Sequence, residues 1–185
     1  QHEHFHAGPN AHHGTGGELH VAAPRVAWEI AEGVRQACIE DGIPARADLN
    51  TGDNFGVAPM HVNQKNGRRW SAATAFLKPA RTRPNLTVET RALTSRVLLE
   101  KNRAVGVEYR QGGQMKTARA EREVILSGGT INSPQLLMLS GIGPAALLAS
   151  HGVAVLKDAP GVGENLQDHL QIRLIFESTR PTTND

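Results

Sequence analysis

One stretch of this 185-residue chain, residues 124–144, constrains its fold more than any other. It opens with the apolar run Val124–Leu126, which is typical of a strand buried on both faces. The pair Gly128-Gly129 follows, and Ser133-Pro134 then offers a hydroxyl cap and a first-turn proline for a helix that runs to Ser140. A strand, a glycine turn and a capped helix in this order predict an α/β arrangement.

The glycine turn also bears on ligand binding. Glycine lets another group approach the backbone closely, and the free amides at a helix start favour an anion or a polar ligand. Glycine turns of this kind also occur where two backbone segments merely pack against each other. The residues of the turn therefore leave a binding role and a packing role both open.

Residues 85–127 predict strands that are joined by short turns. The segments 96–99 and 104–109 flank a turn at 101–103, and Gln111-Gly112-Gly113-Gln114 is typical of a hairpin connection to a polar return strand. Three more strands are expected, at 85–90, 123–127 and 170–176. In the strand at 170–176, apolar and polar residues alternate.

Two further segments carry helical signals. The first begins at Pro24, shows apolar residues at helical spacing, including Val34 and Cys38, and ends at Asp41-Gly42. The second opens at Pro144 and ends at His151-Gly152. Together with the strands, these helices predict a mixed α and β chain, and Cys38 on the apolar stripe is expected to be buried.

The first 19 residues are rich in His and Gly and show no period, so they predict a loop or a frayed terminus. Imidazole is a common metal ligand, but no Cys or carboxylate stands at a diagnostic spacing. We therefore expect no functional metal site, although adventitious binding of nickel or zinc is expected for the five histidines His2, His4, His6, His12 and His13.

Composition limits the classes of function. The formal charge of +2 is small, and the arginines between residues 68 and 96 lack the interleaved aromatic residues of a nucleic-acid surface. No apolar run approaches the roughly 20 residues of a membrane helix, and no secretory signal is present. A single cysteine permits no internal disulfide and fits a cytoplasmic location. We expect no nucleic-acid partner and no transmembrane segment.

Residues 129–143 contain a dense set of motif positions, and similar motifs flank them. Gly129-Thr130-Ile131-Asn132-Ser133-Pro134-Gln135-Leu136-Leu137 with Ser140-Gly141-Ile142-Gly143 resembles the second signature of the glucose-methanol-choline family of flavoenzymes. The order and spacing of the motifs agree with this family from about residue 13 to residue 178. The flanking matches are residues 13–17, 67–71, 76–77, 84–88 and 161–169.

The resemblance implies a Rossmann-like FAD-binding domain and oxidation of an alcohol by hydride transfer to the flavin. It also implies that Thr94 contacts the adenine end of FAD through its backbone, where the family often has Val. Ser127, Gly128 and Gly129 are implied to lie against the adenosine and ribose. In the full-length protein the implied partners are a choline-like or other primary alcohol and an electron acceptor, oxygen or a quinone. A homo-oligomer is possible within this family.

Some family motifs are absent from these residues. The family's GxGxxG motif and its catalytic histidine context do not occur here, so we assign no catalytic residue and expect no turnover from this chain alone. Three parts are expected: a loop-rich junction segment, part of the FAD-binding domain, and the start of a substrate-domain sheet. Their ranges are 1–84, 85–169 and 170–185. A non-catalytic nucleotide-binding module is the alternative hypothesis.

Overall fold

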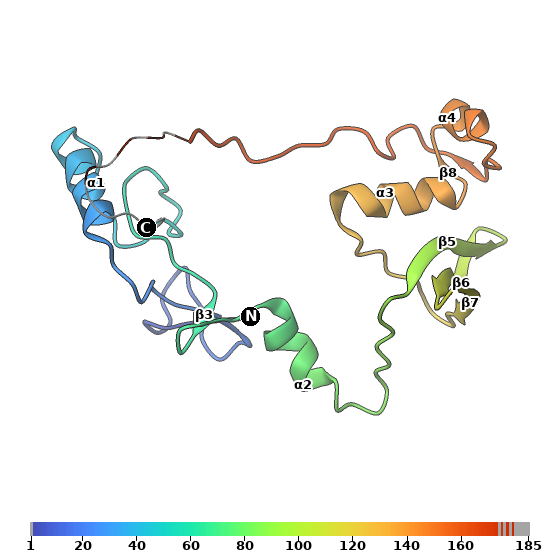
Figure 1. Cartoon of the computed structure of the whole chain (residues 1–185), viewed down its shortest axis with the longest axis horizontal. Coiled ribbons are helices and arrows are strands. Elements are labelled where there is room, and N and C mark those ends of the chain that lie inside the picture. The colour runs from blue at the N-terminus through green and yellow to red at the C-terminus, as the bar shows by residue number, and fades with distance from the viewer. Residues whose placement is uncertain (1, 174, 176, 178, 180–185) are drawn as a thin grey trace. The chain divides into compact units, whose positions relative to one another are not determined.

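The computed structural model describes residues 2–173, 175, 177 and 179. The chain contacts form two units, one built on residues 2–88 and the other on Glu89–Arg173. Each unit mixes helices and short sheets (Figure 1). The mixed α and β content confirms the predicted fold class, whereas the assignment of segments to an FAD-binding domain and a substrate domain stays a prediction.

The second unit is organised around a three-stranded antiparallel sheet. Its strands are β5 (Leu93–Glu100), β6 (Arg103–Gln111) and β7 (Gln114–Arg119), in the order β5-β6-β7. Lys101 and Asn102 in the first turn, and Gly112 and Gly113 in the second, all have positive φ angles. Two positive φ angles define the hairpin turns whose twist matches that of the strands. Both predicted hairpins are confirmed.

Helix α3 (Gly129–Leu139) packs against β5 (Figure 1). It begins five residues before the predicted start, because Gly128 rather than Ser133 is its N-cap and Pro134 lies inside the helix. Ser133 does not cap the helix as predicted; its hydroxyl instead accepts a hydrogen bond from the Gly128 N–H. The helix ends where predicted, since Ser140 is its C-cap.

The predicted helix at 144–152 is confirmed as α4 (Ala145–Ser150), with Pro144 and His151 at its caps. Two short strands, β8 (Ile142–Gly143) before α4 and β9 (Lys157–Asp158) after it, pair in parallel. Leu148 on α4 is buried and forms part of the small core of the unit together with Val97 of β5.

Two predicted strands are not found, and a third lies partly outside the described residues. Residues 85–90 have no strand structure, and Arg91 directly after them has a positive φ angle. Residues 123–127 form no strand either, and Ile125 is 76% exposed, because no described segment pairs with this apolar run. At 170–176, residues 170–173 lie outside any strand, while Leu174 and Phe176 lie outside the described residues.

The first unit contains β1 (Glu3–Phe5) paired in parallel with β2 (Leu19–Val21), and the hairpin β3 (Gln64–Lys65) and β4 (Arg68–Arg69). The π-helix η1 (Ala73–Leu77) continues into α2 (Lys78–Ala80). The prediction of a loop or frayed terminus over residues 1–19 holds as a loop for residues 6–18, but it is wrong for Glu3–Phe5 and Leu19, which are in strands. Backbone hydrogen bonds tie this segment down; one of them runs from the Phe5 N–H to the Gly14 carbonyl.

Helix α1 (Glu29–Glu40) starts five residues after Pro24, because Trp28 has an extended backbone conformation. Its end at Asp41-Gly42 agrees with the prediction. The apolar stripe is not buried as expected: Val34 is 58% exposed and Cys38 only half-buried. Among the described helices, none is long and apolar enough to cross a bilayer.

Candidate functional site

A pocket of about 640 Å³ opens in the second unit, between the three-stranded sheet and α3. Strands β5, β6 and β7 form one wall, and residues 123–128 with one face of α3 form the other. The volume lies within the roughly 300–1,000 Å³ that is usual for small-molecule sites. The lining residues are Ala92–Thr94, Gly106, Val107, Ala118–Ala120, Glu123–Gly128, Asn132, Gln135, Leu136 and Leu139.

Thr94 lies on this wall near the start of β5, where it is half-buried and opposite Tyr109. The register between β5 and β6 shifts directly after it, since Arg96 is the next residue with a partner. Ser95 is therefore the extra residue of a β-bulge, a feature that disturbs the hydrogen-bond ladder and twists the strand. The bulge leaves Ser95, directly after Thr94, without a partner on β6.

Ser127 and Gly128 line the opposite wall, so the structure brings three of the four predicted site residues to one pocket. Gly129, the fourth, starts α3 next to the pocket but is not among the lining residues. The Gly128 N–H already donates to Ser133 Oγ over 3.0 Å. The first amides of a helix have no partner within the helix. The binding role of these residues remains a prediction.

The sequence reasoning missed the polar residues that α3 contributes. Asn132 and Gln135 line the pocket together with Leu136 and Leu139. These positions are spaced i, i+3, i+4 and i+7, which is the spacing of one helix face. The same pattern would have identified them once the helix was extended back to Gly129. Their amide groups can donate to and accept from a heteroaromatic ring or a sugar hydroxyl.

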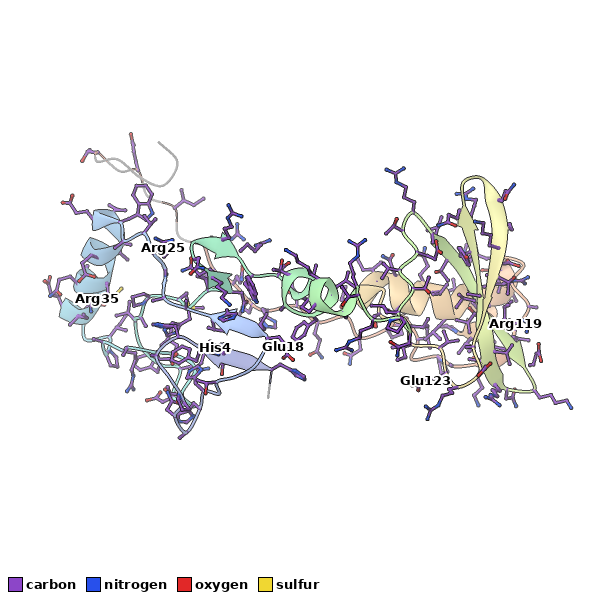
Figure 2. All side chains as sticks on the ribbon, turned by 90° about the horizontal axis from the view of Figure 1, so that it is seen from below. His4, Glu18, Arg25, Arg35, Arg119 and Glu123 are labelled. Carbon is purple, nitrogen blue, oxygen red and sulfur yellow. The ribbon has the colours of Figure 1, made fainter. Side chains whose placement is uncertain are left out.

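Two charged residues of opposite sign lie at the pocket, Arg119 at the end of β7 and Glu123 in the loop that follows (Figure 2). Arg119 is engaged outside the pocket, because its Nη1 donates to Glu100 Oε1 over 2.8 Å. The lining therefore combines apolar side chains, backbone groups, neutral amides and the carboxylate of Glu123. Such a lining suits an uncharged nucleoside better than an isolated phosphate.

The first unit contains a second polar centre, around His13. The His13 side chain is only 5% exposed, and its two ring nitrogens contact two carboxylates. Nδ1 lies 2.9 Å from Glu3 Oε1, and Nε2 lies 2.7 Å from Asp48 Oδ2. The ring stacks on Phe5, with centroids 3.9 Å apart, and His61 Nδ1 lies 3.6 Å from Asp48 Oδ1.

These contacts favour charged groups in the centre. The hydrogen bond to Glu3 raises the pKa of His13, burial opposes the rise, and Asp48 adds to it. Burial works against ionisation of Glu3, but the Gly14 N–H and His13 together lower the pKa of its carboxyl. The pKa of Asp48 is lowered by the Asn50 N–H, against the effect of burial and with the help of His13. The contacts therefore favour the charged form of all three groups, His13, Glu3 and Asp48.

Both ring nitrogens of His13 are hydrogen-bonded to carboxylates, those of Glu3 and Asp48. In the part of the chain that the structure describes, no group of three His, Cys, Asp or Glu side chains could hold a metal ion. The centre connects β1, the turn at His13 and the loop after α1. The hydrogen bonds of its His13 ring are with side chains of the same unit, and the pocket near Thr94 is the candidate site.

The chain resembles known flavoenzymes in sequence and in structure. It is 46% identical over 170 residues to the oxygen-dependent choline dehydrogenase of Brucella anthropi, covering 92% of this chain and 31% of that protein. It is also 46% identical over 176 residues to the mitochondrial choline dehydrogenase of Mus musculus, covering 95% and 30%. The chain therefore spans about a third of the length of these curated relatives.

Solved structures give the same result. Pyridoxine 4-oxidase from Mesorbium loti superposes with a TM-score of 0.80 at 35% identity, covering 85% of this chain and 31% of that one. Formate oxidase superposes with a TM-score of 0.81 at 28% identity, covering 91% and 31%. The fold is accordingly that of part of an FAD-binding oxidoreductase. The family model for GMC oxidoreductases matches residues 8–171, and the chain belongs to the GMC oxidoreductase family. Membership confirms the resemblance and indicates FAD as the cofactor.

Proposed function

We propose that this chain forms the adenosine side of the FAD site in an alcohol-oxidising enzyme. The observation that carries the proposal is the meeting of Thr94, Ser127 and Gly128 at one pocket, although 33 residues separate Thr94 from Ser127. Bound FAD supplies the hydride acceptor for oxidation of the alcohol to an aldehyde. The residues described here hold the cofactor and do not touch the reacting carbon.

The pocket fits an adenosine group by its chemistry. The β-bulge after Thr94 presents backbone groups, Gly128 adds no side chain to the opposite wall, and the amides of Asn132 and Gln135 can pair with ring nitrogens or hydroxyls. Leu136 provides an apolar surface for the flat ring. Backbone contacts explain why Thr can stand at position 94 where the family often has Val.

The purified chain should bind AMP, and FAD should compete with AMP, while riboflavin should not bind, because riboflavin lacks the adenosine that the pocket takes. Calorimetric titration measures the three affinities. Thr94→Val is a control that should change the AMP affinity by no more than about twofold, because it keeps the backbone contact. Equal binding of riboflavin and AMP, or no binding of AMP, would contradict the assignment of the pocket.

For the full-length protein we propose a primary alcohol as substrate, with choline as the first candidate because relatives are named choline dehydrogenases. We propose oxygen or a quinone as the electron acceptor and the cytoplasm as the location. Anaerobic addition of choline to the FAD-loaded full-length protein should bleach the flavin absorbance, and air should restore it if oxygen is the acceptor. Failure of choline and of simple aliphatic and aromatic primary alcohols to bleach the flavin would refute the proposal.

A further inference from the structure

Ser140 is one of two polar residues that are buried among the described residues, the other being His13. It stands at the C-cap of α3 and is 6% exposed. A buried hydroxyl needs hydrogen-bond partners, because leaving it unpaired costs free energy. The partners of Ser140 come from two different elements.

The hydroxyl of Ser140 connects α3 with β5. It donates to the Leu136 carbonyl over 2.6 Å, and it accepts from the Val97 N–H over 2.8 Å. Strand β5 is at the edge of its sheet, with β6 on its other side. Ser140 therefore satisfies a buried N–H for which the sheet has no neighbouring strand. No other hydrogen bond joins α3 to β5 in the described chain.

The two elements that Ser140 connects are the two walls of the pocket. Val97 lies three residues after Thr94 on β5, and Leu136 is itself a lining residue on α3. Loss of the hydroxyl would leave the Val97 N–H unpaired and would free the end of α3 to shift along β5. Such a shift changes the distance between the Thr94 wall and the face that carries Gln135.

We propose that Ser140 is a positioning residue that holds the two walls at the separation needed for the adenosine group of FAD. This proposal rests on the proposed function of the pocket. Ser140 does not line the pocket and does not contact the cofactor itself. Its effect on binding passes through the hydrogen bond to Val97. The effect can therefore be measured both as a change in ligand affinity and as a change in amide exchange at Val97.

The test compares Ser140→Ala with Ser150→Ala in the purified chain. Ser150 is a matched control, since its hydroxyl also donates to a carbonyl near the end of its helix, that of Leu147 at 2.8 Å, but it is exposed and no hydrogen bond ties it to a strand. Ser140→Ala should weaken AMP binding by about tenfold and speed amide exchange at Val97. Ser150→Ala should change the AMP affinity by no more than about twofold.

Ser140→Cys keeps the size of the side chain with a weaker hydrogen-bonding group and covers the case in which Ser140→Ala does not fold. It should give an intermediate loss of AMP affinity. Faster exchange at Val97 with unchanged AMP affinity in a folded variant would overturn the positioning role while leaving the proposed function intact. No AMP binding by the unaltered chain would overturn both proposals.

Discussion

His13→Ala should lower the free energy of unfolding of the first unit by about 3 kcal/mol near pH 6, because it leaves the carboxylates of Glu3 and Asp48 close together without their cation. This figure is at the lower end for a broken buried pair, since the Glu3 side chain is 27% exposed and partly solvated. The loss should be large compared with that of an ordinary surface substitution, which is within about 0.5 kcal/mol.

The same centre predicts the pH dependence of stability. The pKa of His13 is raised above its ordinary value of 6.5, so its contribution is complete below that value and is lost as the pH rises through the raised pKa. The lowered pKa values of Glu3 and Asp48 act in the opposite direction. Their contribution is complete above the ordinary values of 4.5 and 3.8 and is lost as the pH falls through the lowered ones. Stability of this unit should therefore be greatest between about pH 4.5 and 6.5.

Urea unfolding followed by tryptophan fluorescence reports on this unit, because both tryptophans of the chain, Trp28 and Trp70, lie within it. His12→Ala is the matched control, since His12 is the exposed neighbour of His13 and should leave the pH profile unchanged. His61 lies against Asp48 as well, so NMR titration of the His13 ring should accompany the unfolding data. A His13 ring that titrates at or below 6.5, or a His13→Ala profile parallel to that of the unaltered chain, would contradict the assignment.

The sequence predicted the features that depend on neighbouring residues. Both hairpin turns and the ends of α1 and α3 follow from local signals such as Lys101-Asn102 and Gly112-Gly113. The first helix start was misplaced because Pro24 suits a first turn, while the backbone remains extended as far as Trp28. A local pattern thus locates turns well and helix starts less well.

Features that depend on distant residues were not predictable in the same way. The partner of His13, Asp48, is 35 residues away, and nothing in the aperiodic His-rich segment indicates that contact. The apolar run at 124–126 predicted a strand, but a strand also needs a neighbour, and no described segment pairs with it. The pocket residues Thr94, Ser127 and Gly128 came from the family resemblance, and two separate segments had to fold together to bring them to one place.

Gly141→Ala should strongly destabilise the second unit. Gly141 has a φ angle of +85°, which costs a residue with a Cβ about 1–2 kcal/mol. A Cβ there would also lie 2.6 Å from the Ala154 carbonyl oxygen and 2.9 Å from Leu156 Cγ. Because the carbonyl oxygen is backbone, relief requires the chain at 154–156 to move. We expect a total loss of about 3 kcal/mol or more, the size of a strained and overpacked site.

The variant Gly152→Ala distinguishes the cost of the positive φ angle from the cost of the steric contact. Gly152 has a similar φ angle of +70°, but a Cβ there would meet nothing within 4 Å. It should therefore show only the backbone cost of about 1–2 kcal/mol. Unfolding followed by far-UV circular dichroism and by amide exchange at β8 measures both variants, since this unit contains no tryptophan. If the two variants lose equal free energy of unfolding, the contact of the added Cβ at position 141 with the Ala154 carbonyl oxygen contributes nothing to the loss.

Gly141→Ala should also weaken AMP binding, since Gly141 directly follows Ser140 and its carbonyl accepts hydrogen bonds from the Leu156 and Lys157 N–H groups over 2.8 and 3.0 Å. Movement of 154–156 would pull on that carbonyl and displace the Ser140 hydroxyl from the Val97 N–H. Gly152→Ala, at the far end of α4, should leave AMP affinity unchanged. If Gly141→Ala destabilises the unit but binds AMP normally, the strain is absorbed at 154–156 and does not reach the hydrogen bond that joins α3 to β5.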